Sequence, residues 1–163
     1  MLRWTSVLIL AGCLAAPAFL AGCDSDDGGS ATVSIQNGFG EMPPWTICHA
    51  NYLDVEFGKI AIGETSGPQK VEPGLDYVLM VAAWADPDCR PENCLPIATR
   101  TEEEVVDGQT RTLSIVMSNH QGPCPPTGVA PIPQDVYERI LALYPEYGFL
   151  PYDQRTSNPE CLE

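Results

Sequence analysis

Cysteine is the residue type with the clearest chemistry in this 163-residue sequence. The chain contains seven, at the following positions: Cys13, Cys23, Cys48, Cys89, Cys94, Cys124 and Cys161. Thiols form lasting disulfides in an oxidising compartment and stay reduced in the cytosol. No two are spaced as in a catalytic Cys-x-x-Cys motif, so the spacing does not indicate an oxidoreductase. The chemistry of these thiols therefore depends on where the chain is sent.

Groups that could serve catalysis are abundant but unorganised. The sequence has no Gly-x-Ser-x-Gly, no His-Glu-x-x-His and no Gly-rich phosphate loop. It has 22 Asp plus Glu against 8 Lys plus Arg, for a net charge of -14 at pH 7. A hydrolase built on two carboxylates stays open, although nothing singles out two of them. So acidic a chain repels phosphate and is not expected to bind nucleic acid.

One acidic segment carries the oxygen ligands that calcium prefers, on Asp86, Asp88, Glu92 and Asn93. It does not match the twelve-residue calcium loop, which needs Gly sixth and Glu twelfth. These four residues are weak calcium candidates, and a solvated acidic loop is the alternative interpretation.

The two histidines suggest a second metal hypothesis. His49 follows Cys48, and His120 precedes Cys124 by four residues, so the four side chains would meet if their strands were neighbours. Adjacent residues of a strand point to opposite faces, which argues against one ion shared by Cys48 and His49. No firm metal site is expected.

The beginning of the chain has the pattern of a secretion signal. Arg3 precedes 19 residues without a charge, Trp4–Gly22, which end in small residues. After Cys23 the chain turns at once to the polar, glycine-rich run from Asp24 to Ser30.

The four residues Leu20-Ala21-Gly22-Cys23 resemble the lipobox of bacterial lipoproteins. The resemblance implies cleavage between Gly22 and Cys23, a diacylglyceryl group on the Cys23 sulfur and an acyl chain on its new amino group. Two or more acyl chains hold a protein stably on a membrane. We expect no other cofactor, and we expect the acidic residues that follow to repel anionic head groups.

Other interpretations of this segment stay open. The same four letters occur at Leu10-Ala11-Gly12-Cys13, but cleavage there would leave too short an apolar region. An uncleaved membrane-spanning helix is long enough at 19 residues. A secreted protein with an unmodified Cys23 is a further alternative.

Removal of the signal and lipidation of Cys23 leave five cysteines in an oxidising compartment. Two bridges among five allow fifteen pairings, and spacing does not choose among them. The short loop from Cys89 to Cys94 favours a local bridge, and Cys48 would then pair with Cys124. Cys161 would be free or would replace Cys124.

Short apolar runs separated by turn signals predict a mainly β fold. Residues from Thr32 to Met117 show period-two patterning, and the continuously apolar run Tyr77–Ala83 is typical of a strand buried on both faces. Glu72-Pro73-Gly74 fits a type II turn, and Asp107-Gly108 predicts a hairpin. We expect a small antiparallel β-sandwich of six or seven strands.

The run Val71–Leu79 resembles a Pro-Gly turn and strand found in prealbumin-like and carboxypeptidase-regulatory-like sandwich modules. Val106-Asp107-Gly108-Gln109-Thr110 resembles a second turn of those modules. The resemblance implies a fold and no activity, because such sandwiches have unrelated functions.

The predicted organisation has four parts. Residues 1–22 are the signal, 23–31 the lipidated cysteine and acidic tether, and 32–121 the sandwich. Residues 122–163 form a proline-rich connector, a short amphipathic helix over Asp135–Tyr144 and a tail. Within the helix, Asp135 and Arg139 are placed to pair.

We therefore expect a lipoprotein anchored in the cell envelope, facing the periplasm or the exterior, with a binding or structural role and no catalysis. Its partner would be an envelope protein or glycan. One alternative is a carbohydrate- or calcium-binding module that uses the Asp86–Asn93 loop or Trp45 and Trp84. Another is a small envelope hydrolase with two acids across a pocket.

Overall fold

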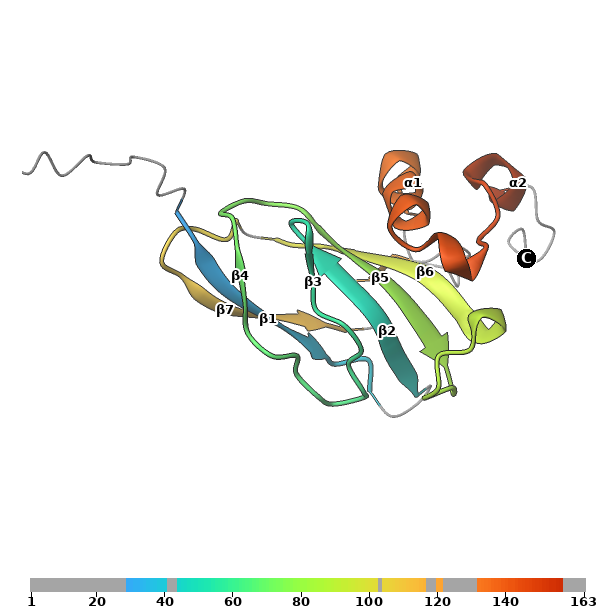
Figure 1. The fold of residues 1–163 in the computed structure, drawn as a ribbon, viewed down its shortest axis with the longest axis horizontal. Helices are drawn as coiled ribbons and strands as arrows, with labels where there is room; N and C mark the ends of the chain where they lie inside the picture. Colours follow the sequence, from blue (N-terminus) through green and yellow to red (C-terminus); the bar gives the residue numbers. More distant parts are fainter. Residues whose placement is uncertain (1–28, 41–43, 103, 117–119, 122–131, 157–163) are drawn as a thin grey trace, which may run out of the picture.

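The computed structural model describes residues 29–40, 44–102, 104–116, 120–121 and 132–156. Two sheets pack face to face, and short helices lie on the outer side of the larger sheet (Figure 1). The strands are β1 Ala31–Asn37, β2 Trp45–Tyr52, β3 Val55–Glu56, β4 Gln69–Val71, β5 Tyr77–Trp84, β6 Cys94–Arg100, β7 Thr110–Ile115 and β8 His120–Gln121. The helices are η1 Pro91–Asn93, α1 Gln134–Leu143, η2 Pro145–Tyr147 and α2 Tyr152–Thr156.

The smaller sheet has the order β4-β1-β7, and the larger has the order β3-β2-β5-β6-β8. All pairs within the larger sheet are antiparallel. In the smaller sheet β1 pairs antiparallel with β4 and parallel with β7, with Ile35 opposite Leu113. The mainly β sandwich with a short C-terminal helix is confirmed, with one parallel pair where only antiparallel ones were expected.

The central strand β5 is buried on both faces, as its continuous apolar run predicts. Val78, Met80 and Ala82 point into the core between the two sheets. Leu79 and Val81 alternate with them and point to a second core beneath the helices. Burying one such side chain contributes roughly 1.5–3 kcal/mol, so the outer face of this sheet needs a cover as much as the inner face.

Helix α1 supplies that cover. Val136, Tyr137 and Ile140 recur with helical spacing and are buried against the larger sheet. The Arg139 guanidinium donates two hydrogen bonds to the Asp76 carboxylate just before β5, one of them 2.9 Å long. Arg139 was expected to pair with Asp135 within the helix. When α1 packs on the sheet, the Asp76 carboxylate accepts a hydrogen bond from each of two Arg139 nitrogens, and this two-fold pairing replaces the expected one.

The two turns predicted from the sequence, at Glu72-Pro73-Gly74 and at Asp107-Gly108, differ from expectation. Gly74 forms an extended bridge with Val105 and has no positive φ, so the type II turn is wrong. At Asp107-Gly108 a turn does form, with the Gln109 amide donating to the Val106 carbonyl at 3.1 Å. The strand that follows pairs with β1, however, and no hairpin results. Val105 is drawn into the core beside Gly74, which leaves β7 free to complete the other sheet.

Several expectations fall outside the described residues. They concern the signal and lipobox, most of the tether, the proline-rich run after Gln121, and Cys124 and Cys161.

We predict that Arg139→Gln lowers the free energy of unfolding by about 1–2 kcal/mol, because it removes a charged pair that is partly exposed. Burial raises the pKa of Asp76, but hydrogen bonds from Arg139 and the Tyr77 amide outweigh burial, and the net shift is downward. The stabilisation is therefore present above the ordinary pKa of 3.8 and is lost as pH falls through the lowered value. Urea denaturation at pH 7 and pH 3 checks both statements.

The surface variant Glu138→Gln is the matched control, since its described partner is Gln134 on the same helix. A loss in Glu138→Gln equal to that in Arg139→Gln would contradict the role of the Asp76 pair. So would a difference between Arg139→Gln and wild type that does not shrink in acid.

Candidate functional site

The loop between β5 and β6 is organised around one buried carboxylate. Asp86 is 1% exposed and accepts hydrogen bonds from four donors. They are the Asn93 amide at 2.7 Å, Arg90 Nε at 2.9 Å, and the backbone amides of Asp88 at 3.0 Å and Arg90 at 3.2 Å. The Asn93 and Arg90 bonds hold the pKa of Asp86 well below its usual range. Asp86 is thus a charged anchor around which the loop folds.

This arrangement changes the interpretation of the acidic segment. Of the four calcium candidates, Asp86 faces inward and Asn93 donates to it, while Asp88 and Glu92 are exposed. A cation would have to compete with a guanidinium and an amide for the same oxygens. Within the described ranges, no three His, Cys, Asp or Glu side chains are grouped as metal ligands.

A disulfide fixes the same loop to the sheet. Cys48 of β2 is bonded to Cys89 of the loop, with Cα atoms 5.7 Å apart. The loop also has a left-handed backbone at Ala85 and Cys89, which is unusual for residues other than glycine. Lys59 Nζ donates to the Pro87 carbonyl from the side of the sheet. The loop is therefore held by the disulfide, by the Lys59 hydrogen bond and by the hydrogen bonds to Asp86.

The third cysteine of this region is a buried thiol. Cys94 opens β6 opposite Ala83, and its Sγ lies 3.9 Å from Cys48 Sγ. The thiol donates to the Arg90 carbonyl at 3.2 Å. Burial, with the negative charges of Asp86 and Glu92, raises the pKa of Cys94 to about 11. At neutral pH it is protonated and a poor nucleophile.

Both expected bridges are therefore wrong. The Cys89–Cys94 bridge fails because Cys94 is fixed in β6 by its register with Ala83, whereas the loop folds over the outer face of the sheet and brings Cys89 to Cys48. The Cys48–Cys124 bridge fails because Cys48 is already bonded. Spacing alone could not show this, because the partner sulfurs are 41 residues apart and meet only through the sheet.

A second polar cluster lies where the end of α1 meets β2 and β3. His49 Nδ1 is 3.2 Å from Glu56 Oε1, and the Tyr144 hydroxyl donates to Glu56 Oε2 at 2.9 Å. The His49 ring lies 5.1 Å from the Tyr144 ring and 5.8 Å from that of Tyr147, centroid to centroid. Sequence reasoning missed this cluster, since Tyr144 and Glu56 are 88 residues apart and no local motif connects them.

The bonds of this cluster hold α1 against the larger sheet. Burial raises the pKa of Tyr144 far above its usual value, and the Glu56 carboxylate adds to the shift, so the phenol stays protonated. In the described part of the chain, His49 bonds to Glu56 and to no hydroxyl or thiol that it could activate. The cluster joins α1 to the sheet and lacks the nucleophile that a hydrolytic triad needs.

The metal hypothesis for the histidines required neighbouring strands. Cys48 and His49 lie on β2, whereas His120 lies on β8, and β5 and β6 separate the two. That condition is not met. Cys124 lies outside the described residues.

Two tryptophans form an aromatic surface at the end of β5. Trp84 of β5 is 60% exposed and stacks on Trp45, its partner on the neighbouring strand β2. The two ring centroids are 6.2 Å apart, and the angle between the ring planes is 24°. The Phe39 ring packs against Trp45, with ring centroids 6.1 Å apart. An exposed, supported indole is a flat apolar face of the kind that stacks on a ring. Of the two tryptophans predicted from the sequence as a binding surface, Trp84 is exposed to solvent and Trp45 is half-buried.

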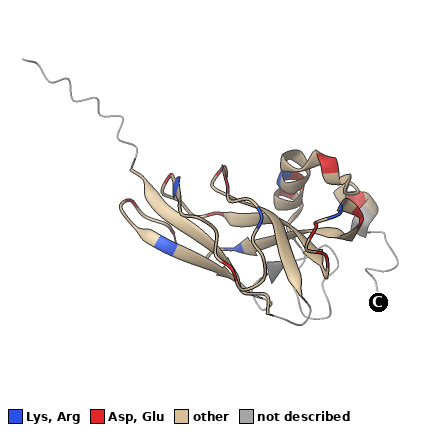
Figure 2. Cartoon of the chain, turned by 60° about the horizontal axis from the view of Figure 1, so that its bottom comes forward, with Lys and Arg blue, Asp and Glu red and all other residues tan. Residues whose placement is uncertain are grey.

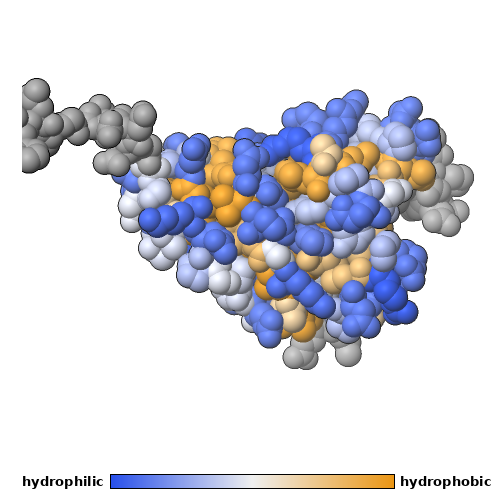
Figure 3. Space-filling model, viewed as in Figure 1, coloured by the Kyte–Doolittle hydropathy of each residue, from blue (hydrophilic) through white to orange (hydrophobic). Residues whose placement is uncertain are grey.

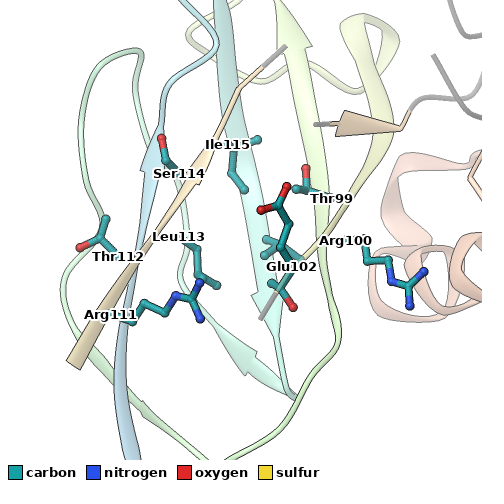
Figure 4. A pocket seen from close by; sticks show the side chains of 10 residues that line it. Thr99, Arg100, Glu102, Arg111, Thr112, Leu113, Ser114 and Ile115 are labelled. Carbon is teal, nitrogen blue, oxygen red and sulfur yellow. The ribbon is translucent and has the colours of Figure 1, made fainter. Parts of the chain in front are cut away.

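A small cleft of about 150 Å³ opens between β6 and β7, at the side where the two sheets part. Figure 4 shows the Arg111 guanidinium and the Glu102 carboxylate directed toward this space, whereas Arg100 points away toward the helices. Thr99 contributes a buried hydroxyl that has no hydrogen-bond partner among the described residues. The cleft suits a small polar group, and its described lining residues include one carboxylate, that of Glu102.

Charge is distributed over the loops and edges and is not concentrated at these sites. Figure 2 shows Asp and Glu on most turns of the domain and few Lys or Arg between them. This pattern agrees with the net charge of -14.

Comparisons with protein-family models, with curated proteins and with solved structures found no match. Within the described ranges, none of the helices has the length and apolar character to cross a membrane.

We predict that Cys89→Ser destabilises the domain by about 4 kcal/mol, the loop-closure value for a bridge between residues 41 apart. Cys94→Ala removes one buried sulfur and no bridge, so it should cost about 1 kcal/mol. Denaturant titration of both variants, without reductant, measures the difference. Peptide mapping of the wild type should recover Cys48 joined to Cys89 and an unbridged Cys94. A Cys89–Cys94 peptide would contradict this assignment.

Proposed function

We propose that the chain is a lipoprotein held in the cell envelope by lipid on Cys23, with a β-sandwich domain that binds a partner and does not catalyse a reaction. The observation that carries this proposal is the sequence Leu20-Ala21-Gly22-Cys23, which ends an uncharged run and precedes a polar, acidic tether. Its resemblance to the lipobox concerns the anchor alone.

Two features of the domain support the anchor. The Cys48–Cys89 disulfide belongs to an oxidising compartment, such as the periplasm or the cell exterior. The first strand begins at one end of the long axis, and the helices and the far end of β5 lie toward the other (Figure 1). A chain attached to lipid through its N-terminal segment would display the Trp84 surface away from the membrane.

The non-catalytic role is supported by what the polar clusters do. Asp86 holds a loop, Glu56 and His49 fasten a helix, and Cys94 is a protonated thiol. Each group with catalytic potential in these clusters has a partner that stabilises the fold. The Arg111 cleft and the Trp84 surface are shaped for binding.

The anchor is tested with Cys23→Ser and its matched control Cys13→Ser in the cell that makes the protein. We expect Cys23→Ser to shift the protein from the detergent phase to the aqueous phase, because two or more acyl chains are what make attachment stable. Cys13→Ser should leave partitioning unchanged. Mass spectrometry should show a mature chain that begins at an acylated Cys23.

An intact Met1, or unchanged partitioning of Cys23→Ser, would refute the anchor. Loss of partitioning in Cys13→Ser alone would move the lipid to the earlier cysteine.

A second candidate function is carbohydrate binding, and the exposed Trp84 stacked on Trp45 is the observation that favours it. We expect Trp84→Ala to weaken binding of cell-wall glycan fragments roughly tenfold, as loss of an aromatic contact does. Leu95→Ala, at the same end of the larger sheet and also exposed, is the control. Calorimetric titration measures both, and absence of heat with the wild type would dismiss this function.

A further inference from the structure

We propose that the end of the sandwich from which the tether leaves is a membrane-contacting surface, on which Leu75 and Val106 enter the interface of a zwitterionic lipid bilayer. This inference rests on the proposed lipid anchor at Cys23. It adds an orientation for the domain, with a second, non-covalent contact to the same membrane.

Leu75 and Val106 form one apolar surface. Each is 51% exposed, although both come from segments that contribute to the core. The bridge between Gly74 and Val105 places Leu75 and Val106 one residue beyond the paired positions. Successive side chains alternate in extended backbone, and Val105 points into the core, so Leu75 and Val106 share the opposite, outward side.

The tether reaches the domain beside this surface. The Gly108 amide donates to the Ser30 carbonyl at 3.0 Å. Gly29 lies so close to the turn that a Cβ there would meet Asp107 Cγ at 2.5 Å. Gly29 and Ser30 also line a shallow hollow together with Leu53 and Lys70. Figure 3 shows apolar surface close to the point where the N-terminal segment meets the domain.

The length of chain between lipid and domain confines this end to the bilayer. Six residues, Asp24–Gly29, separate Cys23 from Ser30, so the seven steps between these two residues span at most about 25 Å at ~3.5 Å each. Whatever the tilt of the domain, the Ser30 end stays near the lipid, while the Trp84 end is free to lie far from it. A short tether produces a roughly millimolar effective concentration, so a weak contact is enough.

Charge decides the kind of lipid. Two bases lie at this end, Lys70 in the hollow beside Ser30 and Arg100 beside Leu75. They are outnumbered by the exposed acids of the same segments: Asp54, Glu72, Glu104 and Asp107. Together with the acids of the tether, these exposed acids repel an anionic surface. A zwitterionic surface carries no net charge, so the apolar contact can form there.

The experiment uses the full-length lipidated protein in phosphatidylcholine vesicles, with tryptophan placed at the surface as Val106→Trp or Leu75→Trp. Brominated acyl chains quench a tryptophan that reaches the interface. Leu150→Trp is the matched control, because Leu150 is 53% exposed and lies between η2 and α2, among the helices. The native Trp45 and Trp84 contribute the same background to every variant.

We expect Val106→Trp and Leu75→Trp to show a blue-shifted emission and a quenching severalfold greater than that of Leu150→Trp. Vesicles containing phosphatidylglycerol should reduce the quenching at low salt and restore it at high salt. Vesicle flotation, measured on the same samples, reports the anchor separately.

Protein that floats with vesicles but shows no more quenching at Val106→Trp and Leu75→Trp than at Leu150→Trp would overturn the contact and leave the anchor standing. Equal quenching at all three positions would also overturn it, because the domain would then have no preferred face. Protein that does not float would refute the anchor, and this inference with it. A dimer in detergent that Val106→Asp dissociates, without quenching, would assign the surface to a second copy.

Discussion

The larger sheet has apolar side chains on both of its faces, and the rest of the molecule follows from the need to cover each of them. On one side the smaller sheet, with Val33, Ile35 and Ile115, completes the core of a sandwich. On the other side α1 covers Leu79 and Val81, and the Asp86 loop lies over Ala83 and is held there by the Cys48–Cys89 bond. A β-sandwich of this size does not need a third layer unless its central strand is apolar throughout, as β5 is.

The polar groups of the domain serve this covering. The Arg139–Asp76 pair fastens the middle of α1 to the sheet, and the Tyr144–Glu56 bond fastens its C-terminal end. Asp86 holds the loop that the disulfide fixes. Each is a charged or buried group with its partner in place, which is what allows it to lie near an apolar core without a large desolvation cost. These clusters therefore stabilise the fold, and the surfaces to which we assign proposed roles are the Trp84 surface and the end of the sandwich at Ser30.

These surfaces lie at different places on the domain, and this separation gives the proposed roles a common geometry. Under the proposed lipid anchor, a tether at the Ser30 end would place one surface toward the lipid and leave the Trp84 end for a partner in solution or in the wall. The acidic residues between these surfaces would oppose contact with anionic lipid or with other acidic proteins, since like charges repel over about 8–10 Å at physiological salt.

By itself the sequence was sufficient for the mainly β class, the buried central strand and the amphipathic helix, because each depends on local periodicity and turn chemistry. The proposed anchor also rests on the sequence alone, because its signal is a run of consecutive residues. Tertiary structure alone decided that β7 pairs with β1, that Arg139 leaves Asp135 for Asp76, and that Cys89 bonds Cys48 and not Cys94. These outcomes depend on which distant segments the two cores bring together. Burial of apolar surface selects that arrangement, and its free energy depends on the area buried and not on how close the residues are in sequence.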